Sequence, residues 1–151
     1  MYNTNTLQKT FEYRIYPNKT VQQQIQKSFD ACRFVYNKTL EAYTKTKANK
    51  LTTQNMLPQL KQETPFLQEV YSKPLQMAQQ QLYHNLRVLK ALKQKGNKVG
   101  KLRFKSKHYY NSINYNQSGF SITNGKISFS KIGAMPIKLH RKFIGKIKGC
   151  I

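Results

Sequence analysis

The sequence predicts an α+β fold, in which a small antiparallel β-barrel carries a helical bundle inserted after its first strand. Three observations predict this order. Apolar residues alternate with polar ones over residues 7–17, recur at three- and four-residue steps over residues 18–95, and fall into short pieces after Gly96. The 151 residues suffice for one domain with a modest core, or for two small lobes that share one.

The first expected element is a half-buried strand over residues 7–17, with the sequence "LQKTFEYRIYP". Period two puts one set of side chains on one face and a second set on the other. The first set is Leu7, Lys9, Phe11, Tyr13 and Ile15, and the second is Glu12, Arg14 and Tyr16. Pro17 ends the strand because its nitrogen carries no hydrogen to donate.

A helix of about seven turns follows, capped by Asn18 or Thr20. Its apolar positions form one core-facing stripe: Val21, Ile25, Phe29, Cys32, Tyr36, Leu40 and Tyr43. A short helix is expected next, with Thr52 or Thr53 as its cap and Pro58 in a first turn or at a kink.

A second long helix is expected from Ser72, taken as its cap, to near Gly96, with Pro74 in the first turn. One side of it is apolar, through Leu75, Ala78, Leu82, Leu86, Leu89 and Leu92 or Lys93. After Gly96 the expected strands are 101–107, 112–117, 119–123, 126–131, 135–140 and 143–148. Asn124-Gly125 gives the strongest hairpin signal in the chain.

The charge is strongly basic and unevenly spread. Lysine and arginine number 27 against five acids, giving a net charge of +22. Residues 96–151 hold 12 of these cations and no acid. Such a segment repels itself unless a polyanion neutralises it, which predicts a nucleic-acid partner. A genome rich in A and T also favours lysine codons, but it leaves the scarcity of glutamate unexplained.

Other partners and cofactors receive little support. No segment joins a long apolar face to a lysine-rich one, as a membrane-surface helix would. No apolar run is long enough to span a membrane and no signal peptide opens the chain, so we expect a cytoplasmic, nucleoid-associated protein. Cys32 and Cys150 form no paired motif, and the histidines are scattered, so we expect no metal site and no cofactor in this chain.

The stretch "GKLRFKSKHYYNSINYNQ", residues 100–117, combines cations, tyrosines and amides. In an extended backbone, Lys101, Arg103, Lys105 and Lys107 point one way, and Leu102 and Phe104 point the other. Cations follow phosphates, tyrosines stack on bases and amides read base edges, so the mixture favours a polynucleotide. The alternative is an ordinary edge strand that lysines protect from pairing with other chains.

Five blocks of sequence carry a family likeness. They are "FEYRIYPNKTVQQQIQKSFDACRFVYNKTLE", "FLQEVYSKPLQMAQQQL", "GNKVGKLRFKSK", "NGKISFSKIGAMPIKLHR" and "GKIK". In order and spacing they resemble the N-terminal part of TnpB, the transposon-encoded RNA-guided DNA endonuclease also labelled OrfB or a transposase. The resemblance implies an oligonucleotide-binding-like "wedge" barrel. Residues 1–17 would supply its first strand, 18–95 the inserted recognition lobe, and 96–151 the remaining strands.

The resemblance also implies partners and site residues. In the family, these parts bind the guide RNA scaffold and the double-stranded DNA motif beside the target. Carried over by position, the motif-reading group is Ser72, Gln76, Tyr115, Asn116 and Gln117. The backbone-contacting positions are Arg33, Asn37, Arg103, Lys105 and Lys107, with Tyr36 between packing and stacking.

Departures from the family limit what is implied. The family shows an aromatic residue in place of Lys101, and proline in place of Leu102 and Ser130. The resemblance therefore does not determine which DNA motif this chain would prefer. Family cleavage uses a RuvC-like domain with three carboxylates and divalent metal, plus a four-cysteine zinc element. All five acids of this chain lie upstream of residue 70. We therefore expect a member truncated before the nuclease domain, without cleavage activity.

That truncation would leave a barrel edge without a partner near Ile144–Ile151, which predicts instability or self-association. Three competing functions remain at this stage. One is a stand-alone DNA-binding regulator of the helix-turn-helix type. Another is a structural RNA-binding protein of ribosomal type, which composition permits. A transposase of the His-x-His plus Tyr type lacks its metal ligands, because the sequence contains no His-x-His.

Overall fold

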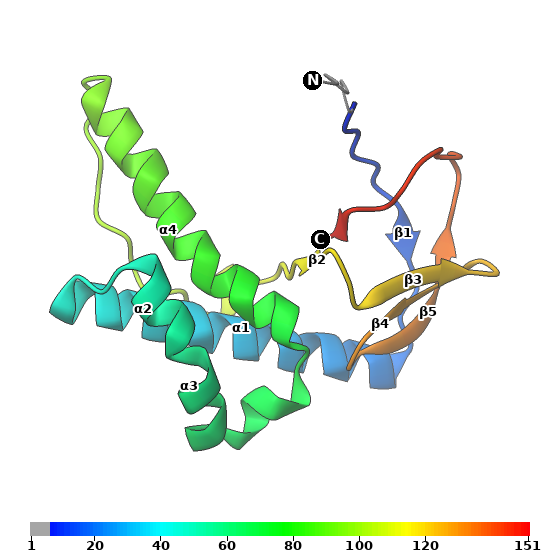
Figure 1. Cartoon of the computed structure of the whole chain (residues 1–151). Coiled ribbons are helices and arrows are strands. Elements are labelled where there is room, and N and C mark those ends of the chain that lie inside the picture. The colour runs from blue at the N-terminus through cyan, green and yellow to red at the C-terminus, as the bar shows by residue number, and fades with distance from the viewer. Residues whose placement is uncertain (1–6) are drawn as a thin grey trace, which may run out of the picture.

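The computed structural model describes residues 7–151, and residues 1–6 of the expected first segment lie outside this range. The chain folds as an α+β structure, as predicted (Figure 1). Strand β1 (Arg14–Ile15) precedes helices α1 (Lys19–Thr46), α2 (Lys50–Asn55), α3 (Leu57–Glu63) and α4 (Ser72–Gln94), with the 3₁₀ helix η1 (Pro65–Glu69) between α3 and α4.

The strands follow α4 and form two antiparallel sheets. They are β2 (Tyr115–Asn116), β3 (Phe120–Thr123), β4 (Lys126–Phe129), β5 (Gly133–Lys138) and β6 (Gly149–Cys150), preceded by a 3₁₀ turn, η2 (Lys107–Tyr109). One sheet has the order β1-β5-β4-β3, and β2 pairs with β6 in the other. Over residues 7–151, strand pairing does not join the two sheets into a closed barrel.

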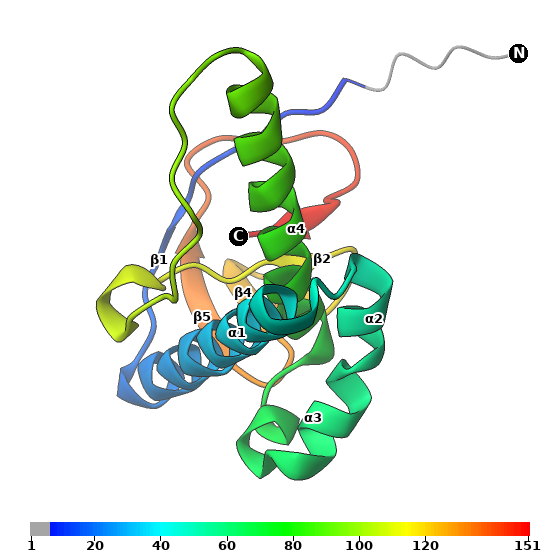
Figure 2. The same cartoon turned by 90° about the vertical axis from the view of Figure 1, so that its left-hand side faces the viewer.

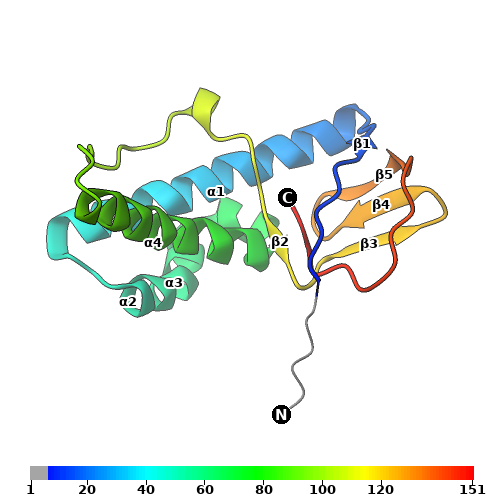
Figure 3. The ribbon, with the colours of Figure 1, turned by 90° about the horizontal axis from the view of Figure 1, so that it is seen from above.

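The two long helices form where apolar spacing predicts them. The Asn18 side chain caps α1 by accepting from the Val21 amide at 2.9 Å, so Asn18 rather than Thr20 is the cap. Val21, Cys32, Tyr36 and Leu40 of the predicted stripe are buried. Figure 3 shows α1 running the length of the molecule, from the other helices to the β1-β5-β4-β3 sheet.

The predicted caps of the later helices are wrong. The expected short helix is two helices, α2 and α3, and Asn49 rather than Thr52 or Thr53 caps the first of them. Pro58 lies in the first turn of α3, where its missing N–H costs nothing. Tyr71 occupies the cap position of α4 and Ser72 is its first residue, with no side-chain cap bond.

The first strand is much shorter than predicted. Arg14 and Ile15 pair with Lys138 and Ile137 of β5, and the Tyr16 amide continues this pairing by one hydrogen bond to the Pro136 carbonyl. β5 ends at Lys138, so the residues before Arg14 have no neighbouring strand to satisfy their backbone groups. Leu7 is consequently 80% exposed and Phe11 38% exposed, rather than facing a core.

Of the later strands, 120–123, 126–129 and 133–138 lie close to their predicted ranges. Asn124 and Gly125 both take positive φ, as a tight hairpin turn requires, so the predicted hairpin is confirmed. The predicted strand 112–117 shortens to 115–116, and neither 101–107 nor 143–148 forms a strand. The β2–β6 pairing uses Gly149 and Cys150 of the edge that was expected to lack a partner, while Ile144 stays fully exposed.

Three apolar clusters hold the elements together, and α1 contributes to each. The sheet cluster joins Val21 of α1 to Tyr115, Ile127 and Met135 of the later strands and to Ile132 in the β4–β5 turn. The central cluster joins Ala31, Cys32 and Val35 of α1 to residues of α3, η1 and α4. The third cluster is Tyr36, Leu40 and Leu82, against which Leu102 and Tyr110 pack. One helix therefore fixes the sheets relative to the other helices.

Candidate nucleic-acid interface

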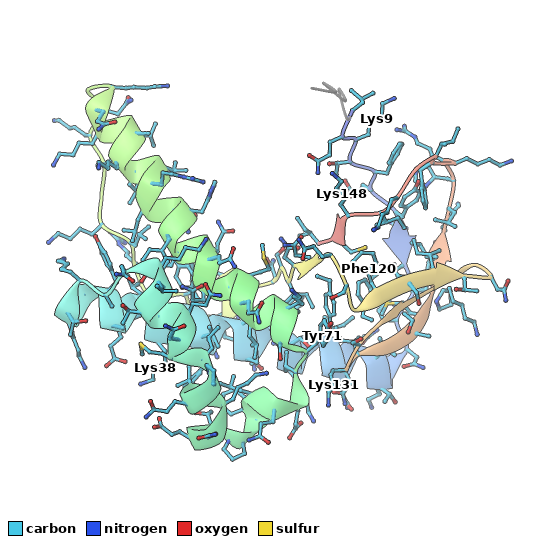
Figure 4. The ribbon with its side chains drawn as sticks, in the orientation of Figure 1. Lys9, Lys38, Tyr71, Phe120, Lys131 and Lys148 are labelled. Carbon is cyan, nitrogen blue, oxygen red and sulfur yellow. The ribbon has the colours of Figure 1, made fainter. Side chains whose placement is uncertain are left out.

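The start of α4 and residues 115–119 meet at one junction. The ring of Tyr71 stacks on that of Tyr115, with 5.6 Å between centroids and 9° between planes. The Tyr71 hydroxyl is hydrogen-bonded to the Ser118 hydroxyl at 3.1 Å. Figure 4 shows Tyr71 at the lower end of α4, on the side facing the strands. We call Tyr71–Gln76 and Tyr115–Gly119 together the junction.

This contact brings together two parts of the predicted motif-reading group that are separated by about forty residues in the chain. Ser72 and Gln76 stand in the first turns of α4, and Asn116 and Gln117 stand in and beside β2. Gln76 and Asn116 are half-buried, and Gln117 is exposed. Three amide side chains, able to donate and accept hydrogen bonds, therefore lie around one part of the surface.

Tyr115, the fifth member of that group, has no exposed face. It is 1% exposed, its hydroxyl donates to the Ser130 carbonyl at 2.7 Å, and its ring lies 4.9 Å from that of Phe129. Burial, more than the neighbouring groups, raises the pKa of Tyr115 above its ordinary value. Tyr115 therefore packs beneath the surface of the junction, and its ring cannot stack on a base in this conformation.

The backbone at Gln117 is held in an unusual conformation. Its φ is +68°, which few residues other than glycine adopt. Its amide donates to the Lys148 carbonyl at 2.9 Å, which continues the β2–β6 pairing by one residue. The side chain of Gln117 is thus presented from a fixed and strained backbone.

Positive charge converges on the same junction. Lys61 of α3 donates a hydrogen bond to the Ser72 hydroxyl. Desolvation, and then repulsion from Lys131 in the β4–β5 turn, lower the pKa of Lys61 below its ordinary value. Two lysines from separate elements therefore approach the start of α4, where the helix dipole is also positive. An anion bound there would relieve their repulsion.

A second group of predicted residues lies further along α1. The Asn37 side chain donates to the Lys105 carbonyl at 3.0 Å and accepts from the Lys105 amide at 2.8 Å. The Lys105 ammonium lies 5.9 Å from the centre of the Tyr36 ring. Tyr36 itself is 1% exposed, and its hydroxyl accepts from Asn85 at 3.3 Å. Asn37 and Tyr36 thus hold residues 101–107 against α1 and are not free to contact a ligand.

Arg33 lies on the same helix but is half-buried. Its guanidinium lies 3.5 Å from the Asp30 carboxylate, an i,i+3 pair on α1. Its Nε atom is buried and has no hydrogen-bond partner within residues 7–151. Only part of this side chain can therefore reach a phosphate.

Arg103 and Lys107 are exposed, as predicted, but the predicted alternation around them is wrong. Leu102 is half-buried in the third cluster, whereas Phe104 is 62% exposed. Residues 101–106 pair with no strand, so nothing imposes the two-residue alternation of a sheet. The alternative reading of this segment as a lysine-protected edge strand is wrong for the same reason.

A larger basic surface, which sequence reasoning missed, includes the second half of α4. Residues 87–107, here called the basic arm, carry nine cations and no acid. The cations are Arg87, Lys90, Lys93, Lys95, Lys98, Lys101, Arg103, Lys105 and Lys107. Figure 2 shows the segment after α4 leaving the far end of the helix and running back toward α1. In the sequence, the three-residue spacing of Arg87, Lys90 and Lys93 was the pattern that could have indicated this basic surface.

The basic arm borders a shallow groove. Its apolar lining comes from Tyr43, Leu86, Leu89 and Val99, and its rim carries Arg87, Lys90 and Lys93. A groove of this kind presents flat apolar surface beside cations, which suits a polymer of bases and phosphates.

The cations of the basic arm and the two lysines at the junction form no ion pairs with the carboxylates of residues 7–151. Within residues 7–151, all four ion pairs use cations of α1: Lys27, Arg33, Lys38 and Lys45. No cation of the basic arm, nor Lys61 or Lys131, takes part in one. The cations nearest the junction and along the arm are thus available to a polyanion.

Metal ligands are not grouped in the part of the chain that the structure describes. No set of three or more His, Cys, Asp or Glu side chains comes together within residues 7–151. Cys32 is buried, and burial raises the pKa of its thiol to about 12, so it remains an unreactive thiol. None of the helices formed by these residues is long and apolar enough to cross a membrane.

Comparison with known proteins agrees with the resemblance read from the five sequence blocks. Residues 1–50 match the family model HTH_OrfB_IS605, described as a helix-turn-helix domain. Over 133 residues, the chain is 30% identical to a Streptomyces pristinaespiralis protein named "Putative RNA-guided DNA endonuclease".

That alignment covers 83% of this chain and 32% of the relative, so the chain spans about a third of the relative's length. The range matched by the helix-turn-helix family contains β1, α1, the turn at Lys47–Asn49 and the first residue of α2. Both matches support the predicted family. Residues 1–50 are thus similar to the OrfB/IS605 helix-turn-helix family, and the chain as a whole is similar to the N-terminal part of TnpB.

Proposed function

We propose that this chain is the nucleic-acid-binding N-terminal part of an RNA-guided DNA nuclease, which binds a guide RNA scaffold and the duplex DNA motif beside the target. The observation that carries the proposal is the junction. There, Ser72, Gln76, Asn116 and Gln117 come together from two distant segments, with Lys61 and Lys131 beside them and, within residues 7–151, no carboxylate paired to either lysine.

The two surfaces suit two kinds of contact. Amides of the junction can donate to and accept from base edges, which gives sequence preference. The cations of the basic arm can neutralise phosphates, which gives affinity without sequence preference. We therefore propose that Arg103, Lys105 and Lys107 act with the rest of the arm on the polymer backbone, and that the junction reads the motif.

The proposed division of the chain follows the family. Residues 1–17 and 96–151 supply strands corresponding to the wedge barrel, and residues 18–95 form the recognition lobe. The pairing of β1 with β5 across the helices supports this division, because the sheet strands flank the helices in sequence. A nucleoid-associated location and self-association through exposed strand edges are part of the same proposal. Ile144 and Ile151, both exposed, are the side chains available for such association.

We propose that this chain does not cleave DNA by itself. Cleavage in the family uses carboxylates that hold divalent metal, and its nuclease domain also carries zinc. The five acids here lie upstream of residue 70, and Asp30, Glu41 and Glu69 are each paired with a cation of α1. Incubation of the chain with supercoiled plasmid and Mg²⁺ tests this, and nicking that survives repurification would contradict it.

A second candidate is a stand-alone DNA-binding regulator, which the helix-turn-helix match over residues 1–50 favours. In that case, specific duplex binding would use α1 and α2 and would need no RNA. The α4 residues Ser72 and Gln76 would then be dispensable.

A salt titration separates the two candidates. Binding to a structured RNA and to a random-sequence duplex with the same number of phosphates is measured as salt is raised. The proposed function predicts a steep log–log slope with both polymers and tighter binding of the RNA. A regulator predicts high affinity for one duplex sequence and no preference for RNA. A protein indifferent to both polymers at low salt would contradict both candidates.

A further inference from the structure

We propose that Tyr71 is a positioning residue: it sets where Asn116 and Gln117 stand relative to Ser72 and Gln76, and so determines how sharply the junction discriminates between DNA sequences. This inference rests on the proposed motif-reading function of the junction. Tyr71 was not among the residues that sequence reasoning singled out.

Three contacts fix the Tyr71 side chain against residues 115–119. Its ring lies parallel to the buried ring of Tyr115. Its hydroxyl is bonded to that of Ser118. Its ring edge fills the space beside Gly119, where an added Cβ would lie 2.3 Å from the Tyr71 Cε1 atom. Because these contacts involve ring face, hydroxyl and ring edge, the side chain has no freedom to rotate without breaking one of them.

Residues 115–119 are in turn anchored to the sheets. The Ser130 amide donates to the Gly119 carbonyl at 2.7 Å, and the Ser130 carbonyl accepts from the Tyr115 hydroxyl. β6 holds the other side, through pairing of Asn116 with Gly149. The segment is thus rigid relative to the sheets, and Tyr71 connects it to the helix that carries Ser72 and Gln76.

The identity of residue 119 is determined by this arrangement. Gly119 has φ of +87°, which already favours glycine, and Tyr71 leaves no room for a side chain. Gly125 provides a matched comparison, because its φ is +71° and an added Cβ would meet nothing within 4 Å. Alanine strains the backbone at both sites but collides with Tyr71 only at Gly119.

The experiment selects bound sequences from a duplex pool with a randomised window and measures base enrichment for the full chain and its variants. The test variants are Tyr71→Phe, Ser118→Ala and Gly119→Ala, and the controls are Tyr109→Phe and Gly125→Ala. Tyr109 is 79% exposed, so its hydroxyl holds no part of the junction. Affinity for a fixed random duplex is measured alongside, since a loss of folding would lower it for every sequence.

We expect Tyr71→Phe and Ser118→Ala each to lower enrichment at the most selected positions by about fivefold, the effect of removing one hydrogen bond. The double variant should lose no more than either single variant, because both remove the same bond. Gly119→Ala should flatten the enrichment further, while the controls keep the wild-type profile. Affinity for the random duplex should be unchanged in the two hydroxyl variants.

Hydrogen exchange gives a readout that needs no DNA. In Tyr71→Phe, the amides of residues 116–119 should exchange faster than in the wild type, while those of α1 stay protected. Faster exchange with an unchanged enrichment profile would overturn the inference and leave the proposed function standing. A wild-type protein that enriches no sequence would overturn the motif-reading function and the inference with it.

Discussion

At the scale of single residues, the side chains predicted to touch nucleic acid divide into those that are exposed and those that hold exposed ones in place. Gln117, Arg103 and Lys107 are exposed. In Asn37, by contrast, both the oxygen and the nitrogen of the side-chain amide are hydrogen-bonded to the backbone of Lys105. An amide that both donates to and accepts from one residue acts like a short stretch of strand pairing, and it ties an otherwise irregular segment to α1.

Replacing Asn37 with Ala should lower the free energy of unfolding by about 1–2 kcal/mol, because two partly buried backbone groups lose their partner. Urea denaturation followed by circular dichroism measures this. Asn111→Ala is the matched control, since Asn111 is exposed. Equal stability of the two variants would contradict the assigned role.

A second prediction concerns Lys61. Desolvation and Lys131 lower its pKa below 10.5, so as pH rises it loses its proton before an ordinary lysine does. Duplex affinity should therefore decline as pH rises toward 10.5, and decline less in Lys61→Arg, whose guanidinium stays charged. The effect of Lys61 on the free energy of unfolding changes with pH in the opposite direction to its effect on duplex affinity. Because the folded protein binds fewer protons, stability gains from this group as pH rises through the same range.

Fluorescence anisotropy with a labelled duplex, at several pH values and constant ionic strength, measures the difference between the two proteins. The ordinary lysines contribute equally to both curves. Parallel curves for wild type and Lys61→Arg would show that Lys61 does not contact the anion.

At the scale of elements, the basic arm and α1 differ in how their charges are satisfied. Four cations of α1, Lys27, Arg33, Lys38 and Lys45, have carboxylates within 4 Å, whereas those of the arm have none among the described residues. Exposed pairs contribute little to stability, but a paired cation has less to gain from a phosphate. The arm should therefore dominate the salt dependence of binding.

The triple variant Arg103→Ala, Lys105→Ala, Lys107→Ala should weaken binding to all sequences about equally. It should also reduce the log–log salt slope by about 0.9 for each phosphate that the protein no longer neutralises. The matched control is Lys27→Ala, Lys38→Ala, Lys45→Ala, which removes the same charge from paired positions of α1. If both triple variants change the slope alike, only net charge matters and the arm is no distinct surface.

The elements also show which features the sequence can predict. Long helices depend on apolar spacing within one segment, and both were predicted to within a few residues at each end. Strands depend on partners: residues 7–13 and 101–106 have suitable residues but no neighbouring strand, and they stay irregular. Likewise, Tyr71, Lys61 and Lys131 reach the junction only through the fold, so no local pattern pointed to them.

At the scale of the whole molecule, the chain folds with a net charge of +22 and with four ion pairs among the described residues. Repulsion between like charges lowers the stability of the compact state. Salt screens that repulsion over distances of about 10 Å at ordinary ionic strength.

We therefore expect the melting temperature of the free chain to rise as sodium chloride is added, and to rise further with RNA at low salt. Scanning fluorimetry measures both effects. The triple variant of the basic arm should depend less on salt, since it carries less uncompensated charge. A melting temperature that salt leaves unchanged would mean that repulsion is not a significant cost in this fold.

The continuous helix α1 also acts as a spacer. Val21 contacts the sheet cluster and Tyr43 borders the groove of the basic arm, and a helix separates these positions by about 33 Å at about 1.5 Å per residue. Helical geometry couples length to direction, so removing a single residue between them would draw the two ends together by about 1.5 Å and turn one about the other by about 100°. The separation of the two ends and the directions they face therefore cannot be changed independently.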